Sequence, residues 1–142
     1  GISTCPCGAE LMKAKLGSQV GAITPTHMQR ADLSILVEFN GQVPITVKDL
    51  INIAYRSMSG SVYSTLKRAD EAFVIYNSLE NTKFVENIYR SALNAVYLKL
   101  SGVKNATAVY ARVESYESIH GYNAIASGWI SMERISKAIA SH

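Results

Sequence analysis

The sequence predicts an all-α fold, a compact bundle of five to seven helices packed around one central helix at residues 84–100. Three observations lead to this prediction. Residues 84–100 carry apolar side chains over more than half of a helix circumference, which is typical of a helix buried on most sides. Patterns that begin and end helices recur along the chain. The links between the expected helices are short, which favours antiparallel neighbours.

The apolar surface of the central helix is built from two adjacent rows of residues at helical spacing: Val85, Tyr89, Leu93, Val96 and Leu100, then Phe84, Ile88, Ala92 and Ala95. The polar remainder is a narrow stripe that includes Arg90 and Asn94. This stripe makes the segment too polar to cross a membrane, which requires about 20 predominantly apolar residues.

The N-terminal residues 1–8, GISTCPCG, have no periodic pattern and are expected to form an extended arm, with residues 9–142 forming one helical domain. A short helix is expected at residues 9–16. Gly17, Gly21 and Pro25 then indicate a flexible connection.

Residues 31–47 allow two interpretations. Thr26 and Gln29 match a capping box, and Asn40-Gly41 would end a helix, so a helix is favoured. The alternative is a β-hairpin at residues 32–47, because apolar residues alternate up to Phe39 and Asn-Gly is a common hairpin turn. Pro44 in the expected return strand weakens the hairpin.

Further helices are expected along the rest of the chain. Thr46 and Asp49 form an N-cap pattern for a helix that ends near Ser59-Gly60. A third helix is expected from Ser61, with apolar residues including Phe73 and Tyr76 facing inward. Helical spacing of apolar residues from Ala106 to Val113 then predicts a helix that frays near residues 118–121. The last expected helix spans residues 122–139, with a bend at residues 127–128.

Composition limits the function. The 142 residues suffice for one domain with a substantial core. The net charge of +3 permits nucleic-acid binding without indicating it, and the low charged fraction of 18% is compatible with self-association. No secretory signal is visible and both cysteines lie in the first seven residues, which favours an intracellular or virion location over secretion.

The cysteine pair near the N-terminus allows four interpretations. Cys5 and Cys7 resemble half of a zinc knuckle, and His27 could be a third ligand, but the one-residue spacing and the lack of a second pair argue against a metal site. Myristoylation of Gly1 together with palmitoylation of Cys5 or Cys7 would supply the two signals that stable membrane anchoring needs, although Cys5 stands where the myristoylation motif requires serine or threonine. The favoured interpretation is two loosely packed thiols, with disulfide cross-linking as a further alternative.

Residues suited to catalysis are sparse. The three histidines, His27, His120 and His142, lie outside any recognisable motif. His120 lies close to Glu117 and Tyr116 and could form a site, but a solvent-facing histidine at the end of a helix explains it equally well. No phosphate-binding loop, metalloprotease helix or dinucleotide fingerprint occurs. The sequence therefore predicts a non-enzymatic protein without a metal or cofactor.

The function predicted from these observations is a self-associating helical structural subunit, coat-like or scaffold-like, whose main partner is itself. Tyr122 and Trp129 are the candidate interface anchors, because such aromatic residues are enriched at interfaces. If the protein contacts nucleic acid, scattered arginines would bind phosphates: Arg30, Arg56, Arg68, Arg90 and Arg112. The alternative is a monomeric helical adaptor that binds a partner protein and is held at a membrane by an acylated N-terminus.

Overall fold

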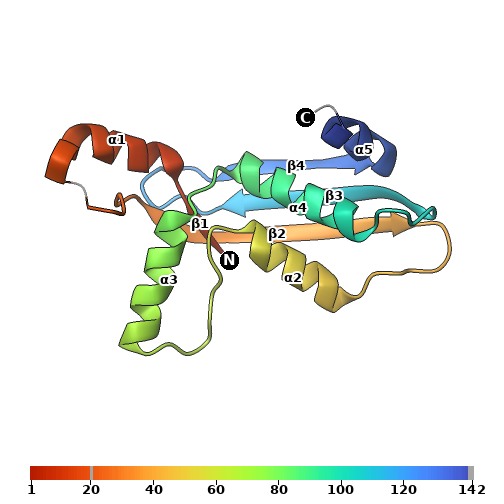
Figure 1. Cartoon of the computed structure of the whole chain (residues 1–142), viewed down its shortest axis with the longest axis horizontal. Helices are drawn as coiled ribbons and strands as arrows, with labels where there is room; N and C mark the ends of the chain where they lie inside the picture. The colour runs from red at the N-terminus through yellow and green to blue at the C-terminus, as the bar shows by residue number, and fades with distance from the viewer. Residues whose placement is uncertain (20, 141–142) are drawn as a thin grey trace.

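The computed structural model, which describes residues 1–19 and 21–140, contains a four-stranded antiparallel sheet in the order β1-β2-β3-β4 (Figure 1). Its strands are β1 (Ile2–Thr4), β2 (Met28–Phe39), β3 (Ala106–Ser115) and β4 (Ala124–Ser131). The helices are α1 (Pro6–Leu16), α2 (Val47–Ser57), α3 (Arg68–Glu80), α4 (Val85–Lys99) and α5 (Met132–Ala140). The fold combines helices with a sheet, so the prediction of an all-α bundle of five to seven helices is wrong.

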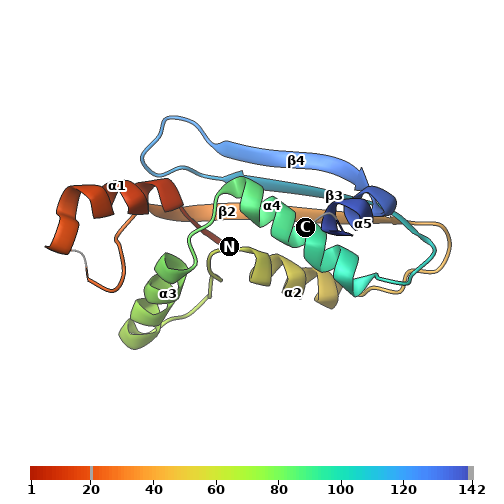
Figure 2. The same cartoon turned by 45° about the horizontal axis from the view of Figure 1, so that its top comes forward.

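Helices α2, α4 and α5 cover one face of the sheet, as the tilted view shows (Figure 2). The other face carries a row of apolar residues that pair across three strands: Leu36 with Tyr110, and Tyr110 with Trp129. Leu36 is 49% exposed and Trp129 is 59% exposed, so helices from the described part of the chain do not cover this row.

The central helix is the part of the prediction that the structure confirms most closely. Helix α4 spans Val85–Lys99 and buries one side against the sheet and α2. Five of its side chains are buried: Val85, Ile88, Ala92, Leu93 and Val96. Ile88 packs in a cluster with Met58 and Val113, and Val96 packs in a second cluster with Val109.

The segment at residues 31–47 is a strand followed by a loop, so the favoured helix is wrong. In β2, residues alternate between half-buried positions such as Ile35 and exposed ones such as Leu36, the period of a half-buried strand. The hairpin alternative is right about this strand and wrong about its partner, since β2 pairs with β3. Gln29, expected in a capping box, instead donates its amide hydrogens to Ser115 and Glu117.

The two helices expected near the C-terminus are also wrong over most of their length. In β3 the buried residues Val109, Ala111 and Val113 alternate with partly exposed ones. Helical spacing omitted Ala111, which is fully buried. The expected last helix is strand β4 up to Ser131, and only α5 after it is helical, with the Ser131 hydroxyl accepting a hydrogen bond from the Arg134 amide at 3.2 Å.

The segment around α3 begins later than predicted. Residues 61–67 are not helical, and Phe73, expected to face inward, is 65% exposed. Helix α3 extends away from the sheet in both views, and Ser78 is its only fully covered side chain among the described residues (Figures 1 and 2). None of the helices in the described ranges is both long and apolar enough to cross a membrane.

The first residues are extended but are part of the sheet. Ile2–Thr4 pair with residues 28–30 of β2, and the Ile2 amide donates to the Gly60 carbonyl at 2.9 Å. Helix α1 begins at Pro6, inside the segment expected to be an extended arm. Proline favours this start because its fixed backbone angle φ is already the one that a helix requires at its first position.

The start of α2 confirms the predicted capping pattern. The Thr46 hydroxyl accepts from the Asp49 amide at 3.1 Å, and the Asp49 carboxylate accepts from the Thr46 amide at 3.0 Å. The other carboxylate oxygen of Asp49 contacts the Lys99 ammonium group on α4 at 2.9 Å. The hydrogen bond from Lys99, followed by those from Thr46, holds the pKa of Asp49 far below its ordinary value.

We expect Asp49→Asn to be less stable than the unchanged protein at neutral pH, with a difference that shrinks as the pH falls. A carboxyl group whose pKa is lower in the folded state stabilises the fold above its unfolded pKa and loses this contribution on acidification. Urea unfolding at pH 7 and at acidic pH measures the difference. A control variant, Glu133→Gln, breaks only the exposed Glu133–Lys137 pair. A destabilisation by Asp49→Asn that stays constant or grows on acidification would contradict the prediction.

Candidate metal centre

Three side chains with metal-binding atoms converge at one end of the sheet. The ligand atoms of His27, Glu117 and His120 all lie within 4.8 Å of one another. His27 directly precedes β2, and Glu117 and His120 lie in the segment that follows β3. Because β2 and β3 are antiparallel, the start of one strand lies beside the end of the other, and the Tyr116 amide donates to the Arg30 carbonyl at 3.0 Å. The pairing of these strands therefore assembles the cluster.

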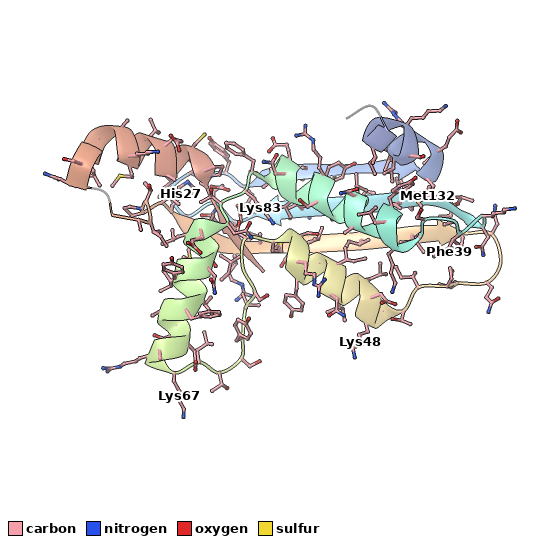
Figure 3. All side chains as sticks on the ribbon, viewed as in Figure 1. His27, Phe39, Lys48, Lys67, Lys83 and Met132 are labelled. Carbon is pink, nitrogen blue, oxygen red and sulfur yellow. The ribbon has the colours of Figure 1, made fainter. Side chains whose placement is uncertain are left out.

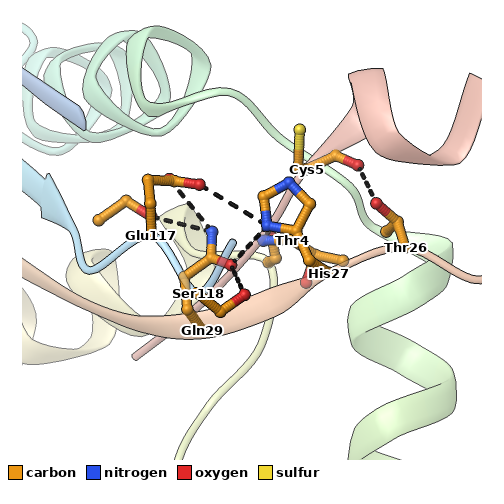
Figure 4. A network of polar contacts seen from close by, with 9 residues as sticks. Thr4, Cys5, Thr26, His27, Gln29, Glu117 and Ser118 are labelled. Carbon is orange, nitrogen blue, oxygen red and sulfur yellow. Dashed lines mark hydrogen bonds and ion pairs between the residues drawn. The ribbon is translucent and has the colours of Figure 1, made fainter. Parts of the chain in front are cut away.

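A buried glutamine fixes the orientation of His27. The Gln29 carbonyl oxygen lies 2.9 Å from His27 Nδ1, and a carbonyl oxygen can only accept, so Nδ1 carries the hydrogen (Figure 4). The same oxygen accepts from the Ser118 hydroxyl, and the Gln29 NH₂ group donates to Ser115 and Glu117. All bonds of this amide are thus used inside the protein. The tautomer it selects leaves the lone pair of His27 on Nε2, so Nε2 is the nitrogen able to bind a metal ion, while the protonated Nδ1 faces Gln29 and Glu117.

Glu117 is positioned from two sides. One carboxylate oxygen accepts from the Gln29 amide at 3.2 Å, and the other lies 3.6 Å from His27 Nδ1. The side chains of Glu117 and His27 are only 11% and 9% exposed, so both polar groups are largely removed from bulk water. A negative charge held at this depth beside imidazole nitrogens is suited to binding a cation.

Cys5 lies beside the cluster at the junction of β1 and α1. Its amide donates to the His27 carbonyl at 3.2 Å, and its carbonyl accepts from the Thr26 hydroxyl at 2.9 Å (Figure 4). Neither cysteine forms a disulfide bond; Cys5 is half-buried and Cys7 is exposed. The cluster of three donors does not include the Cys5 sulfur, but this thiol lines the same cavity as Glu117.

The cavity next to the cluster has a volume of about 160 Å³. Its walls come from β1, β2, the start of α4 and the segments around β3 and β4: Ser3, Cys5, Gln29, Lys83, Phe84, Val85, Glu86, Glu117 and Ala124. Lys83 donates from Nζ to the carbonyls of Ser57 and Met58 at 3.1 and 3.2 Å, and burial lowers its pKa. In the view of Figure 3, Lys83 lies between His27 and Met132, closer to His27.

The sequence indicated all three residues of the cluster as candidates but did not predict that they lie together. The sequence places His27 with the cysteines and His120 with Glu117, and it disfavours both as separate sites. Gln29 and Lys83 were missed as functional candidates. In the sequence Gln29 fits a capping box with Thr26, and its role at the site follows only from the pairing of β2 with β3. The prediction of no metal site rested on the one-residue spacing of Cys5 and Cys7 and on the lack of a second pair of ligands.

The remaining candidate residues lie outside the cluster, with one exception. The five candidate arginines occupy five different elements: Arg30 on β2, Arg56 on α2, Arg68 on α3, Arg90 on α4 and Arg112 on β3. Arg112 pairs with Glu114 at 2.6 Å. Trp129 packs against Tyr110 on the open face of the sheet. Tyr122 is the exception, since its ring stacks on His120.

The candidate N-terminal modification sites differ in accessibility. The Gly1 amino group donates to the Ala31 carbonyl at 2.8 Å, and burial is the main cause of its lowered pKa. Cys5 is half-buried and Cys7 is exposed. N-terminal acylation, contact with nucleic acid and formation of a homo-oligomer stay predictions.

Comparison with known proteins identifies the family. Residues 1–126 match the family model described as Type I GTP cyclohydrolase folE2. GTP cyclohydrolase MptA of Methanocaldococcus jannaschii is 32% identical over 100% of this chain and 50% of its own length. GTP cyclohydrolase FolE2 of Pelobacter propionicus is 34% identical over 88% of this chain and 42% of its own length. The chain thus spans about half the length of the curated relatives it matches.

These matches correct the predicted function. The family and its relatives are cyclohydrolases, so the prediction of a non-enzymatic, self-assembling, coat-like or scaffold-like subunit is wrong, and so is the alternative of an adaptor. The match of residues 1–126 covers His27, Glu117 and His120. The chain belongs to the type I GTP cyclohydrolase folE2 family.

Proposed function

We propose that this chain carries the metal centre of a GTP cyclohydrolase, which hydrolyses GTP by opening a ring of the base. The observation that carries the proposal is the convergence of His27, Glu117 and His120 within 4.8 Å, in a chain whose relatives are named GTP cyclohydrolases.

The donor set fits a divalent transition-metal ion. Two imidazole nitrogens and one carboxylate oxygen are common ligands of catalytic zinc, and such sites keep a further position open. Imidazole also suits iron and other first-row metals. The hydrogen bond from His27 to Gln29 is of the kind that orients metal-binding histidines in many proteins, in which the second ring nitrogen donates to a protein group. The half-buried Cys5 thiol adds a soft donor at the edge of the same cavity.

Hydrolytic opening of a ring in guanine breaks a bond between carbon and nitrogen, because hydrolysis cleaves a bond from carbon to a heteroatom and nitrogen is the only heteroatom in these rings. The oxygen of water adds to the carbon, and the departing ring nitrogen takes up a proton. A bound divalent cation would supply a water molecule of lowered pKa and stabilise the developing negative charge. The chain's own groups hold the reacting atoms in place and limit the access of bulk water.

The cavity beside the cluster offers groups that could bind the base. Glu86, at the start of α4, presents a carboxylate that can accept two hydrogen bonds, and guanine has neighbouring N–H donors on one edge. Lys83 lines the same wall and uses two of its three donors on backbone carbonyls, which leaves one N–H for an acceptor in the cavity. This arrangement matches a base that presents both donors and a carbonyl acceptor.

We expect the 142-residue protein to convert GTP into a product heavier by one water molecule, or into fragments derived from it. Chelation should abolish the reaction and re-addition of Zn²⁺, Mn²⁺ or Fe²⁺ should restore it. The assay combines mass spectrometry with the loss of purine ultraviolet absorbance. Adenosine triphosphate is the matched control, since adenine lacks the N–H donor and the carbonyl of the guanine edge. Turnover that is unchanged by chelation would contradict the proposal.

A further inference from the structure

The two histidines of the cluster are held in different ways. His27 is nearly buried and donates from Nδ1 to Gln29. His120 is exposed, lies in the segment between β3 and β4, and has no hydrogen bond to its ring from any residue in the described ranges. A metal-binding histidine normally donates its second ring N–H to a protein group that sets its orientation. His120 lacks this support, so another contact must orient its ring.

The contact is aromatic. The ring of Tyr122 stacks on that of His120, with centroids 5.2 Å apart and planes inclined by 13°. On the other side His27 meets His120 edge-on, with centroids 5.9 Å apart and an interplanar angle of 86°. Tyr122 itself is 68% exposed, and its hydroxyl group has no hydrogen-bond partner among the residues that the structure describes. Stacking on His120 is therefore the structural role that the Tyr122 ring fulfils.

We propose that Tyr122 is a positioning residue that holds the His120 imidazole in the orientation for binding a metal ion. The inference rests on the proposed metal centre. A stacked pair restricts rotation of the imidazole about its side-chain bonds, so the nitrogen is already aimed at the cluster before the ion arrives. Tyr122 acts through its ring face, so its hydroxyl group is dispensable.

The test is Co²⁺ binding by the metal-free 142-residue protein, followed by the visible absorption of the bound ion. We expect Tyr122→Ala to weaken Co²⁺ binding about tenfold, as loss of an outer-shell partner does, and to shift the absorption bands. Tyr122→Phe should bind Co²⁺ like the unchanged protein because it keeps the stack. Tyr63→Ala removes another exposed tyrosine from an irregular segment and should have no effect. Tyr122→Leu provides a second variant without an aromatic ring.

Each outcome decides the inference. Unchanged affinity and spectra in both Tyr122→Ala and Tyr122→Leu would overturn it, and so would a Tyr122→Phe variant that binds as weakly as Tyr122→Ala. Failure of the unchanged protein to bind Co²⁺ would overturn the proposed metal centre itself. The behaviour of the unchanged protein therefore separates the failure of the proposed function from the failure of the role assigned to Tyr122.

Discussion

Replacing Glu117 with glutamine is expected to remove metal from the protein and to lower GTP turnover by about 100-fold or more. This loss is at least as large as the loss of activity that follows when a residue hydrogen-bonded to a metal ligand is replaced. Glu117 supplies the only carboxylate of the cluster, and it is largely buried between Gln29 and His27. A neutral amide of the same shape cannot balance the charge of a divalent cation. Metal content after dialysis and the initial rate with GTP measure the two effects.

The matched control for this variant is Glu71→Gln, which neutralises an exposed carboxylate on α3. The Glu71→Gln variant should retain metal and activity, because the Glu71 side chain is not part of the cluster of His27, Glu117 and His120. Full metal occupancy in Glu117→Gln would contradict the role of Glu117 as a ligand. Circular dichroism of both variants shows whether any loss reflects unfolding.

Ile88→Ala is expected to destabilise the protein by about 2–5 kcal/mol, the range for removing a large aliphatic side chain from a packed core. Ile88 has no exposed surface and packs with Met58, Val85 and Val113, where α4 meets the sheet. Truncation therefore removes buried apolar surface and leaves a cavity. Urea unfolding measures the change in the free energy of unfolding.

The matched control is Ile75→Ala on α3, where the isoleucine is 48% exposed. Exposed positions away from special contacts usually change stability by less than about 0.5 kcal/mol. Equal losses of stability in the two variants would contradict the assignment of the core to α4 and the sheet.

Local signals predicted the helices α2 and α4 well. The capping box of Thr46 and Asp49 lies within four residues, and the apolar face of α4 repeats over four turns. The sheet was missed because its strands also contain apolar residues at helical spacing. In β3 the residues Val109 and Val113 fit both periods, and only the buried Ala111 between them distinguishes a strand.

The candidate site could not be assembled from the sequence for the same reason. His27 and Glu117 are distant in the sequence, and their proximity depends on the register in which Ala31 pairs with Ser115. With both segments interpreted as helices, no physical argument placed these side chains together. A strand assignment for residues 28–39 and 106–115 would have brought their ends together.

Crystals grown with Zn²⁺ and measured at its absorption edge would test the central claim most directly. The account predicts one anomalous peak between His27, Glu117 and His120, at ordinary zinc distances of about 2.0–2.2 Å from nitrogen and oxygen. A protein that binds zinc elsewhere, or that leaves these three side chains without a peak, would contradict the assignment of the metal centre.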